Sequence, residues 1–416
     1  MMGTLVCFEL KKAVRSRFFL LVFCVAILVN FLTQCGIAEY QGYLYAMRSV
    51  GDEAPTHIET FFEYVGGERN VTRIMSEVSA SIEFMSEEEH AEAVAALKEK
   101  YGETVLSDYT FLESDAIRQV PGVLANLSDY EYLTNIEMLE KINSSANQKI
   151  SNVLKSAESF RQEAELEKDI YGVRKNESIE QLYSIPRQAI TTYIRYGGDL
   201  FFESPAMLLV FLLLLLTASR SVAGEHDRRT WLLLHTAKYG KGKTLLAKYI
   251  SGWLIGMVLT VILQVFSILA YYFKGGTLGF DQPVTAIEQL ILCPYSIQVW
   301  QYFLLSICCQ IFTAMLFSTI LTSVSAFSRP SFISCGIGAL LLGLFLLPVY
   351  FPPRTEWLAG PLVLSSPLRF FERYYDANIF GFSVPWVVVL ALVWSIFAVA
   401  MAIVTTKVYH RKDRVV

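Results

Sequence analysis

Residues 205–248 read PAMLLVFLLLLLTASRSVAGEHDRRTWLLLHTAKYGKGKTLLAK. The first 15 of these residues carry no charge, whereas the 29 residues from Arg220 to Lys248 hold seven basic and two acidic side chains. A membrane-spanning helix needs roughly 20 mainly apolar residues. The residues just after Arg220 can extend the run, because an arginine reaches its charged group to the membrane surface. An apolar span followed by a short basic loop predicts a membrane protein with this loop in the cytoplasm.

The composition of the whole chain agrees with a membrane protein. Of its 416 residues, 53% are hydrophobic and 18% are charged, whereas soluble domains have about 25% charged residues. The charge-free segments that could cross a bilayer are Phe18–Ala38, Pro205–Ser219, Tyr249–Phe273, Ile297–Ser328, Ser331–Tyr350 and Val384–Thr406. We therefore expect an all-α membrane protein with six transmembrane helices. The fourth and fifth spans meet at Arg329-Pro330, which predicts a helical hairpin with a very short turn.

These spans divide the chain into seven parts. They are a cytoplasmic amphipathic lead (1–17), transmembrane helix 1 (18–38), an extracytoplasmic domain (39–203), helix 2 (204–223), a cytoplasmic loop (224–247), helices 3–6 (248–406) and a basic tail (407–416). The lead either lies on the membrane surface as a helix or only anchors the first span. The first span lacks a clear small-x-small cleavage site, so we expect it to stay uncleaved.

The distribution of charge predicts the orientation. Residues 38–203 hold 30 acidic and 15 basic side chains. Of the 20 basic residues elsewhere, 16 lie in the lead, the 220–248 segment, the tail or at Arg329. Cytoplasmic segments of membrane proteins are enriched in Lys and Arg, so we expect both termini and the basic loop inside the cell. We therefore predict a multi-pass protein of the plasma membrane.

The predicted external domain has its own sequence features. All seven cysteines lie outside residues 38–203, so the domain has no disulfide framework, which favours a bacterial origin. Ser86–Glu89 fits a helix-capping box, and Gly102 is a fitting stop for the helix that follows. The apolar spacing of Ser128–Gln162 predicts another helix. Pro121-Gly122 breaks the chain between the two, and Ile190–Tyr196 could form a strand. We therefore expect a mainly helical domain.

The sequence gives no support to several chemistries. Gly242-Lys243-Thr244 resembles the end of a nucleotide-binding phosphate loop, but position 237 is Ala where that loop requires Gly. The five histidines are scattered and form no metal-binding pattern. We expect no catalytic residue, no metal, no cofactor bound by this chain and no nucleic-acid partner.

The spans also argue against an ion-coupled carrier. They contain no Asp, Glu, Lys, Arg or His, whereas such carriers commonly place ionisable groups within the membrane. Polar residues do occur there, at Asn30, Gln34, Gln264 and Gln310. We interpret them as hydrogen-bonding partners between helices rather than as substrate contacts.

The loop after the second span resembles that of the ABC-2 type permeases, the membrane subunits of a class of ABC transporters. Glu225, Thr230, Leu232–Leu234 and Lys248 match that family in kind and spacing. The start of the chain, Phe8–Lys12 followed by Arg15-Ser16-Arg17, is similar to the family's start. Leu364–Leu368 fits the family's external re-entrant region, and the basic tail fits as well.

The loop also departs from the family pattern. Arg229 stands at the family's Gly, Lys238 at its Pro, and Gly240-Lys241 at its Ser-Arg pair. These departures affect the turn residues of the loop rather than its apolar run.

The resemblance implies that the loop forms a coupling helix that docks in a groove of a separate ABC ATPase. Trp231, Leu233 and Leu234 would be the apolar anchors of this contact, and the polar contacts would be Glu225, Arg228, Arg229 and Thr230. It further implies an exporter built from two permease subunits, identical or different. The exposed apolar run also requires a partner on physical grounds. The alternative is a helix on the lipid surface, with its leucines in the bilayer.

The sequence also fits two other classes of function. One is a sensor or receptor, whose external domain would bind a ligand and signal through the cytoplasmic loop. The other is a membrane-embedded enzyme or scaffold. The transported substrate is left open, since a cation, a peptide and a lipid-linked molecule all fit the sequence.

Overall fold

The computed structural model describes ten stretches of the chain. They are residues 2–49, 81–83, 127–188, 190, 192–194, 206–230, 242–273, 279–328, 330–350 and 360–411. The chain divides into two compact units. The bundle unit contains residues 1–34, 201–270 and 301–416, and the domain unit contains residues 35–200 and 271–300.

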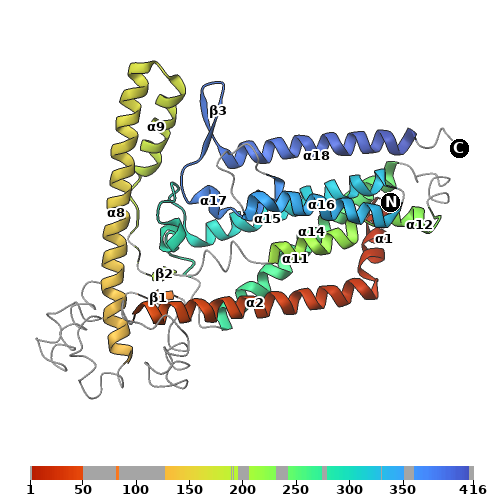
Figure 1. The fold of residues 1–416 in the computed structure, drawn as a ribbon, viewed down its shortest axis with the longest axis horizontal. Coiled ribbons are helices and arrows are strands. Elements are labelled where there is room, and N and C mark those ends of the chain that lie inside the picture. The colour runs from red at the N-terminus through yellow and green to blue at the C-terminus, as the bar shows by residue number, and fades with distance from the viewer. Residues whose placement is uncertain are drawn as a thin grey trace, which may run out of the picture. The chain divides into compact units, whose positions relative to one another are not determined.

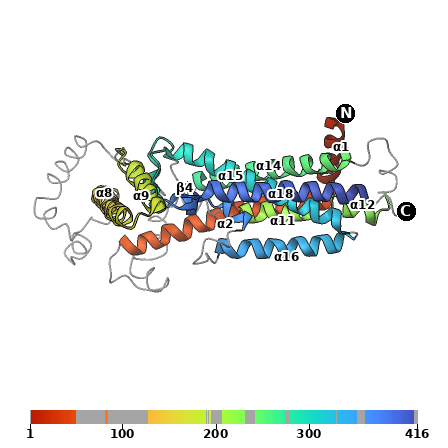
Figure 2. The same ribbon diagram turned by 90° about the horizontal axis from the view of Figure 1, so that it is seen from above.

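Long helices form the bundle unit and run side by side (Figures 1 and 2). They are α2 (Arg17–Ser49, in its first half), α11 (Ala206–Ala218), α14 (Gly242–Phe273), α15 (Val299–Phe327), α16 (Ser331–Tyr350) and α18 (Trp386–Arg411). Helix α1 (Met2–Val14) leaves the start of α2 steeply and crosses the direction of the bundle. Shorter elements are α12 (Ala223–Asp227), η5 (Pro361–Ser365), α17 (Leu368–Phe371) and the hairpin of β3 (Asp376–Ile379) with β4 (Phe382–Pro385).

Among the described residues, five helical segments are long and apolar enough to cross a membrane. They are Arg17–Cys35, Ala206–Asp227, Gly242–Ala270, Val299–Phe327 and Trp386–Tyr409. These segments agree with five of the predicted spans and confirm the all-α membrane class. The remaining predicted span coincides with α16, whose apolar stretch Ser331–Leu347 is shorter, so a sixth crossing stays a prediction. Only residues 328–330 join α15 to α16. This short connection agrees with the tight turn predicted at Arg329-Pro330.

The helix boundaries differ most from the predicted spans at two places. Helix α14 begins at Gly242 rather than at Tyr249, because Leu245 and Ala247 are buried in the bundle and extend its apolar face. Residues 242–247 therefore belong to a helix and not to the loop. Helix α2 continues to Ser49, beyond the predicted end at Ala38.

Helix α11 lies in the middle of the bundle core. Val210, Phe211 and Leu214 are at most 1% exposed, and the rings of Phe211 and Phe317 meet edge to face with centroids 5.3 Å apart. A helix that is apolar on every side is typical of a protein core or of a membrane span. Because lipid tails are as apolar as leucine, close packing rather than escape from water stabilises such a core.

Two glycines allow α14 and α15 to approach closely. A Cβ atom on Gly252 would collide with Ser318 Oγ, and one on Gly256 would lie 3.3 Å from Ala314 Cβ. The two glycines are four residues apart, which is the small-residue spacing of close helix pairs in membranes.

Three of the four Asn and Gln residues singled out in the spans form hydrogen bonds between helices. Asn30 donates to Leu263 O and to Ser267 Oγ, each at 3.0 Å, and Gln264 donates to Gln310 Oε1 at 2.7 Å. These bonds confirm the predicted role of three of the four residues. Gln34 is fully buried, and its amide atoms have no hydrogen-bond partner among the described residues.

The domain unit contains a helical hairpin of α8 (Leu127–Glu167) and α9 (Ile170–Tyr183) (Figure 1). Helix α8 confirms the helix predicted at Ser128–Gln162. Strand β1 (Ser81–Glu83) pairs antiparallel with β2 (Thr192–Ile194), which confirms a strand within Ile190–Tyr196. The features predicted at Ser86–Glu89, Gly102 and Pro121-Gly122 lie outside the described residues.

The connection between α14 and α15 also belongs to the domain unit, which the sequence did not indicate. It contains η2 (Val284–Ala286) and η3 (Glu288–Leu290). Tyr183 at the end of α9 donates its hydroxyl to Leu292 O at 2.6 Å. Burial raises the pKa of the nearby Cys293 thiol to about 11. The inserted domain is therefore completed by residues from a second connection of the chain.

Candidate functional site

Four charged side chains meet at the basic end of the bundle, and we call them the charge cluster. Glu9 and Lys12 come from α1, Glu225 from α12, and Lys248 from α14. Lys248 Nζ lies 2.6 Å from Glu225 Oε1 and 3.3 Å from Glu9 Oε1. Lys12 Nζ lies 2.8 Å from the same Glu225 oxygen. The cluster therefore joins three helices that are far apart in the sequence.

The centre of the charge cluster is almost completely buried. The side chains of Lys248 and Glu225 are 0% and 3% exposed, and that of Lys12 is 34% exposed. Lys248 also donates to Ser221 O at 2.7 Å, in the turn between α11 and α12. Buried charges are tolerated only when they are paired and hydrogen-bonded, because removing them from water is costly. Each member of the pair therefore depends on the other.

Helix α12 is also fixed to the two helices of the α15–α16 hairpin. Ser325 Oγ on α15 accepts hydrogen bonds from the backbone N–H groups of Val222 (3.1 Å) and Ala223 (2.9 Å). Asp227 Oδ2 accepts from the N–H of Ser331, the first residue of α16, at 3.1 Å. Such bonds satisfy donors that helix starts leave unpaired.

The end of α12 has an unusual backbone. Arg229 has a φ angle of 55°, and the N–H groups of Arg229 and Thr230 donate to His226 O and Glu225 O, each at 3.0 Å. This left-handed conformation costs a side-chain-bearing residue about 1 kcal/mol, whereas glycine adopts it freely. A glycine at this position would therefore fit the turn better than Arg229 does.

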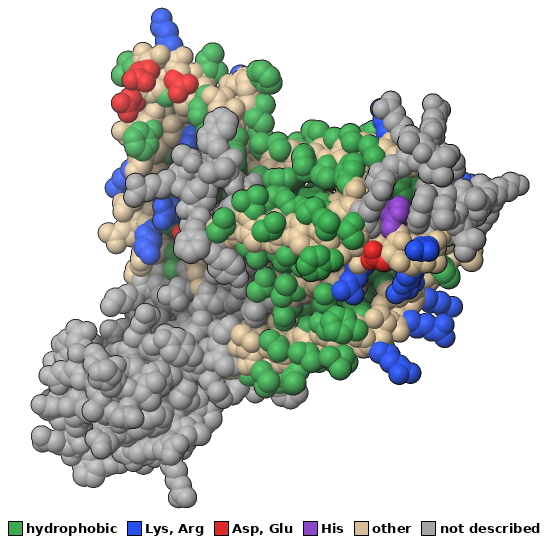
Figure 3. All heavy atoms as spheres, turned by 45° about the vertical axis from the view of Figure 1, so that its right-hand side comes forward, with side chains coloured by type: hydrophobic (Ala, Val, Ile, Leu, Met, Phe, Trp, Pro, Cys, Tyr) green, Lys and Arg blue, Asp and Glu red, His purple; other side chains and the backbone are tan. Residues whose placement is uncertain are grey.

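The predicted docking residues fall into three groups. Glu225 is 2% exposed and holds Lys12 and Lys248, so in this structure it offers no surface contact. The side chains of Arg228, Arg229 and Thr230 are exposed at the end of α12. The three apolar residues, Trp231, Leu233 and Leu234, lie outside the described residues. Figure 3 shows that Lys and Arg side chains gather at one end of the bundle, next to a broad apolar surface.

A comparison with protein families gives one match, to a family described as ABC-2 family transporter protein, over residues 4–353. The chain belongs to this ABC-2 family. No curated protein and no solved structure matches it. The matched region begins within α1 and continues past α16, so it includes the charge cluster of this ABC-2 permease.

Three members of the charge cluster in this ABC-2 permease, Glu9, Lys12 and Lys248, were not predicted to act together with Glu225. They all lie in segments that carry the family resemblance, but a single sequence does not indicate that residues more than 20 positions apart form a pair. The usable signal was the presence of acidic residues within two basic segments, since Glu9 is the one acidic residue of the lead and is followed by four basic residues before the first span.

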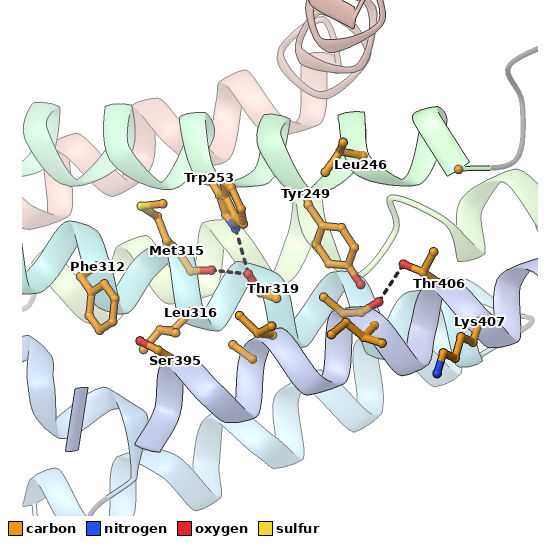
Figure 4. A pocket seen from close by; sticks show the side chains of 15 residues that line it. Leu246, Tyr249, Trp253, Phe312, Met315, Leu316, Thr319, Ser395, Thr406 and Lys407 are labelled. Carbon is orange, nitrogen blue, oxygen red and sulfur yellow. Dashed lines mark hydrogen bonds between the residues drawn. The ribbon is translucent and has the colours of Figure 1, made fainter. Parts of the chain in front are cut away.

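The ABC-2 permease also has an apolar groove between α14, α15 and α18, with a volume of about 900 Å³ (Figure 4). Trp253 of α14 lies across it and donates to Thr319 Oγ1 of α15 at 2.8 Å. Phe312 lies toward one end of the groove and Lys407 toward the other. The lining contains no acidic side chain among the described residues.

Proposed function

We propose that this ABC-2 permease is driven by ATP hydrolysis in a separate ABC ATPase, which docks on the segment after α12. The charge cluster is the observation that carries this proposal. It attaches α12, which directly precedes that segment, to α1 and α14 by ion pairs, while Ser325 and Ser331 attach α12 to α15 and α16.

This arrangement supports the transmission of movement from the loop to the spans. A displacement of α12 would strain the Glu225–Lys248 pair, and the pair resists separation because either charge alone would be buried without compensation. The helices that contact α12 would therefore move with it. A loop attached to one helix end by exposed contacts would transmit much less movement to the spans.

The docking surface is proposed from chemistry as well as from the family. Trp231, Leu233 and Leu234 would supply the apolar centre, and Arg228, Arg229 and Thr230 the polar margin. Trp and Arg are enriched among the residues that carry most of the energy of protein interfaces. Glu225 is assigned here to holding α12 rather than to touching the ATPase.

The remaining parts of the proposal are the orientation, the assembly and the direction of transport. Because Lys and Arg gather at the end of the bundle that holds α12, the positive-inside rule supports a cytoplasmic position for this end and for both termini. The domain unit would then be extracytoplasmic. Two permease subunits, identical or different, and an exporting direction follow from the resemblance. The family match gives no support to a sensor or receptor.

The first test is co-purification of the solubilised permease with an ABC ATPase from the same cells. We expect the Trp231→Ala, Leu234→Ala double variant to retain at least about tenfold less ATPase, since two apolar anchors contribute roughly 1–2 kcal/mol each. Leu254→Ala, on the exposed face of α14, is the matched control and should retain wild-type amounts. Equal retention by the double variant and the wild type would refute docking at this loop.

A further inference from the structure

We propose that the groove between α14, α15 and α18 binds one acyl chain of an anionic phospholipid, with the lipid phosphate at Lys407. The lipid would come from the leaflet at the basic end of the bundle. This inference depends on the membrane location of the three helices and not on the proposed ATPase partner.

The position of the groove determines what can fill it. All three lining helices belong to the candidate membrane spans, and α18 also exposes Ile396, Val399 and Ile403 on its surface. The opening of the groove therefore faces the hydrocarbon of the bilayer. The side chains that line an empty groove would lack van der Waals contacts on its open side. The acyl chains of the surrounding lipid are the molecules available to fill it.

The polar groups of the groove are already satisfied. Thr319 Oγ1 accepts from Trp253 and donates to Met315 O at 2.9 Å. Thr406 donates to Ala402 O at 2.8 Å, and Ser395 donates to Ala391 O at 2.7 Å. A chain of waters or a polar ligand needs several free partners, and these side chains provide few. An alkyl chain needs none.

The length of the groove fits one leaflet. Along α18 the lining runs from Ser395 to Lys407, which spans about 18 Å at the 1.5 Å rise of an α-helix. One leaflet contributes about 15 Å of hydrocarbon, half of the thickness of a bilayer core. An acyl chain lying between the ends marked by Phe312 and Lys407 (Figure 4) would therefore bring its head group level with Lys407.

The charge at that end favours an anionic head group. Lys407 is exposed and makes no salt bridge within the described part of the chain. The sequence continues with Arg411, Lys412 and Arg414. Clusters of basic residues that directly follow a membrane span attract anionic lipids. An uncharged or zwitterionic lipid would fill the same groove but would not use this charge.

Native mass spectrometry of the purified permease tests this inference, with phosphatidylglycerol and phosphatidylcholine vesicles of matched chain length as probes. We expect the wild type to retain one phosphatidylglycerol per chain. Ala402→Phe, which fills the groove, should abolish retention, whereas Leu392→Phe on the exposed face of α18 should not. Lys407→Ala should reduce the preference for phosphatidylglycerol about fivefold, and Lys407→Arg should keep it.

Three results would overturn the inference. They are unchanged lipid retention in Ala402→Phe, equal retention of both lipids by the wild type, and conversion of a dimer to a monomer by Ala402→Phe with lipid retention intact. The last result would make the groove a contact between two copies of the chain. Lys407→Ala lies at the exposed end of the groove, so it tests the head-group contact even if Ala402→Phe does not fold.

Discussion

Replacing Lys248 with Met is expected to lower the free energy of unfolding by about 3 kcal/mol, the size of effect seen when one partner of a buried ion pair is removed. Methionine matches the length of the lysine stem but cannot bond to Glu225, Glu9 or Ser221 O. Glu225 would then be paired only with Lys12, whose side chain is partly exposed. The measurement is chemical unfolding of the purified protein in mixed micelles.

Two further variants show whether the loss comes from the charge cluster. Lys243→Met removes a positive charge one turn earlier in the same helix, where the side chain is exposed, and should change stability little. Adding Glu225→Gln to Lys248→Met should recover part of the loss, because a neutral amide is less costly to bury than a carboxylate that has lost its buried partner. If Lys248→Met and Lys243→Met were equally stable, the buried pair would not hold these helices together.

Gly252→Leu is expected to be the second most damaging substitution, because it would force α14 away from α15. A Cβ at this position already collides with Ser318 Oγ, and the rest of a leucine side chain would meet Thr322 as well. Inserting extra atoms into a packed core costs about 1–3 kcal/mol. The expected result is loss of the monodisperse protein in size-exclusion chromatography after mild heating.

The controls for this prediction come from the same chain. Gly252→Ala should be much milder, because the Ser318 hydroxyl can rotate away from one added methyl group. Gly336→Leu in α16 should leave stability nearly unchanged, since nothing lies within 4 Å of a Cβ at that position. Equal effects of the leucine at both glycines would mean that the α14–α15 contact does not limit stability.

Most of the bundle could be predicted because its signal is local. Each span is a charge-free apolar run, and such a run has few alternatives to a membrane helix. Helix starts were less predictable. Gly240 and Gly242 look like turn residues, yet α14 begins at Gly242 because Leu245 and Ala247 find buried positions against other helices.

The charge cluster shows the limit of reading one sequence. Glu225 was predicted to contact a partner protein from the loop, but its ion-pair partners Lys248 and Lys12 are 23 and 213 positions away. Whether a charged side chain is buried or exposed depends on how the helices pack together, and a single sequence does not show that packing. Glu225 was therefore predicted at the surface, and the structure places it inside. The same reason applies to the α14–α15 connection, which joins the domain unit through Tyr183 and Leu292.

The most direct test of ATPase docking is a photo-crosslinking measurement in native membranes, with a photoreactive amino acid at position 231 and a control at position 147 in α8. We expect position 231 to crosslink to an ABC ATPase and position 147 not to. Because an ATPase that uses cellular ATP works in the cytoplasm, the same product would support the orientation. Crosslinking of position 231 to lipid alone would contradict ATPase docking at this loop and would place the Trp231–Leu234 segment on the bilayer surface.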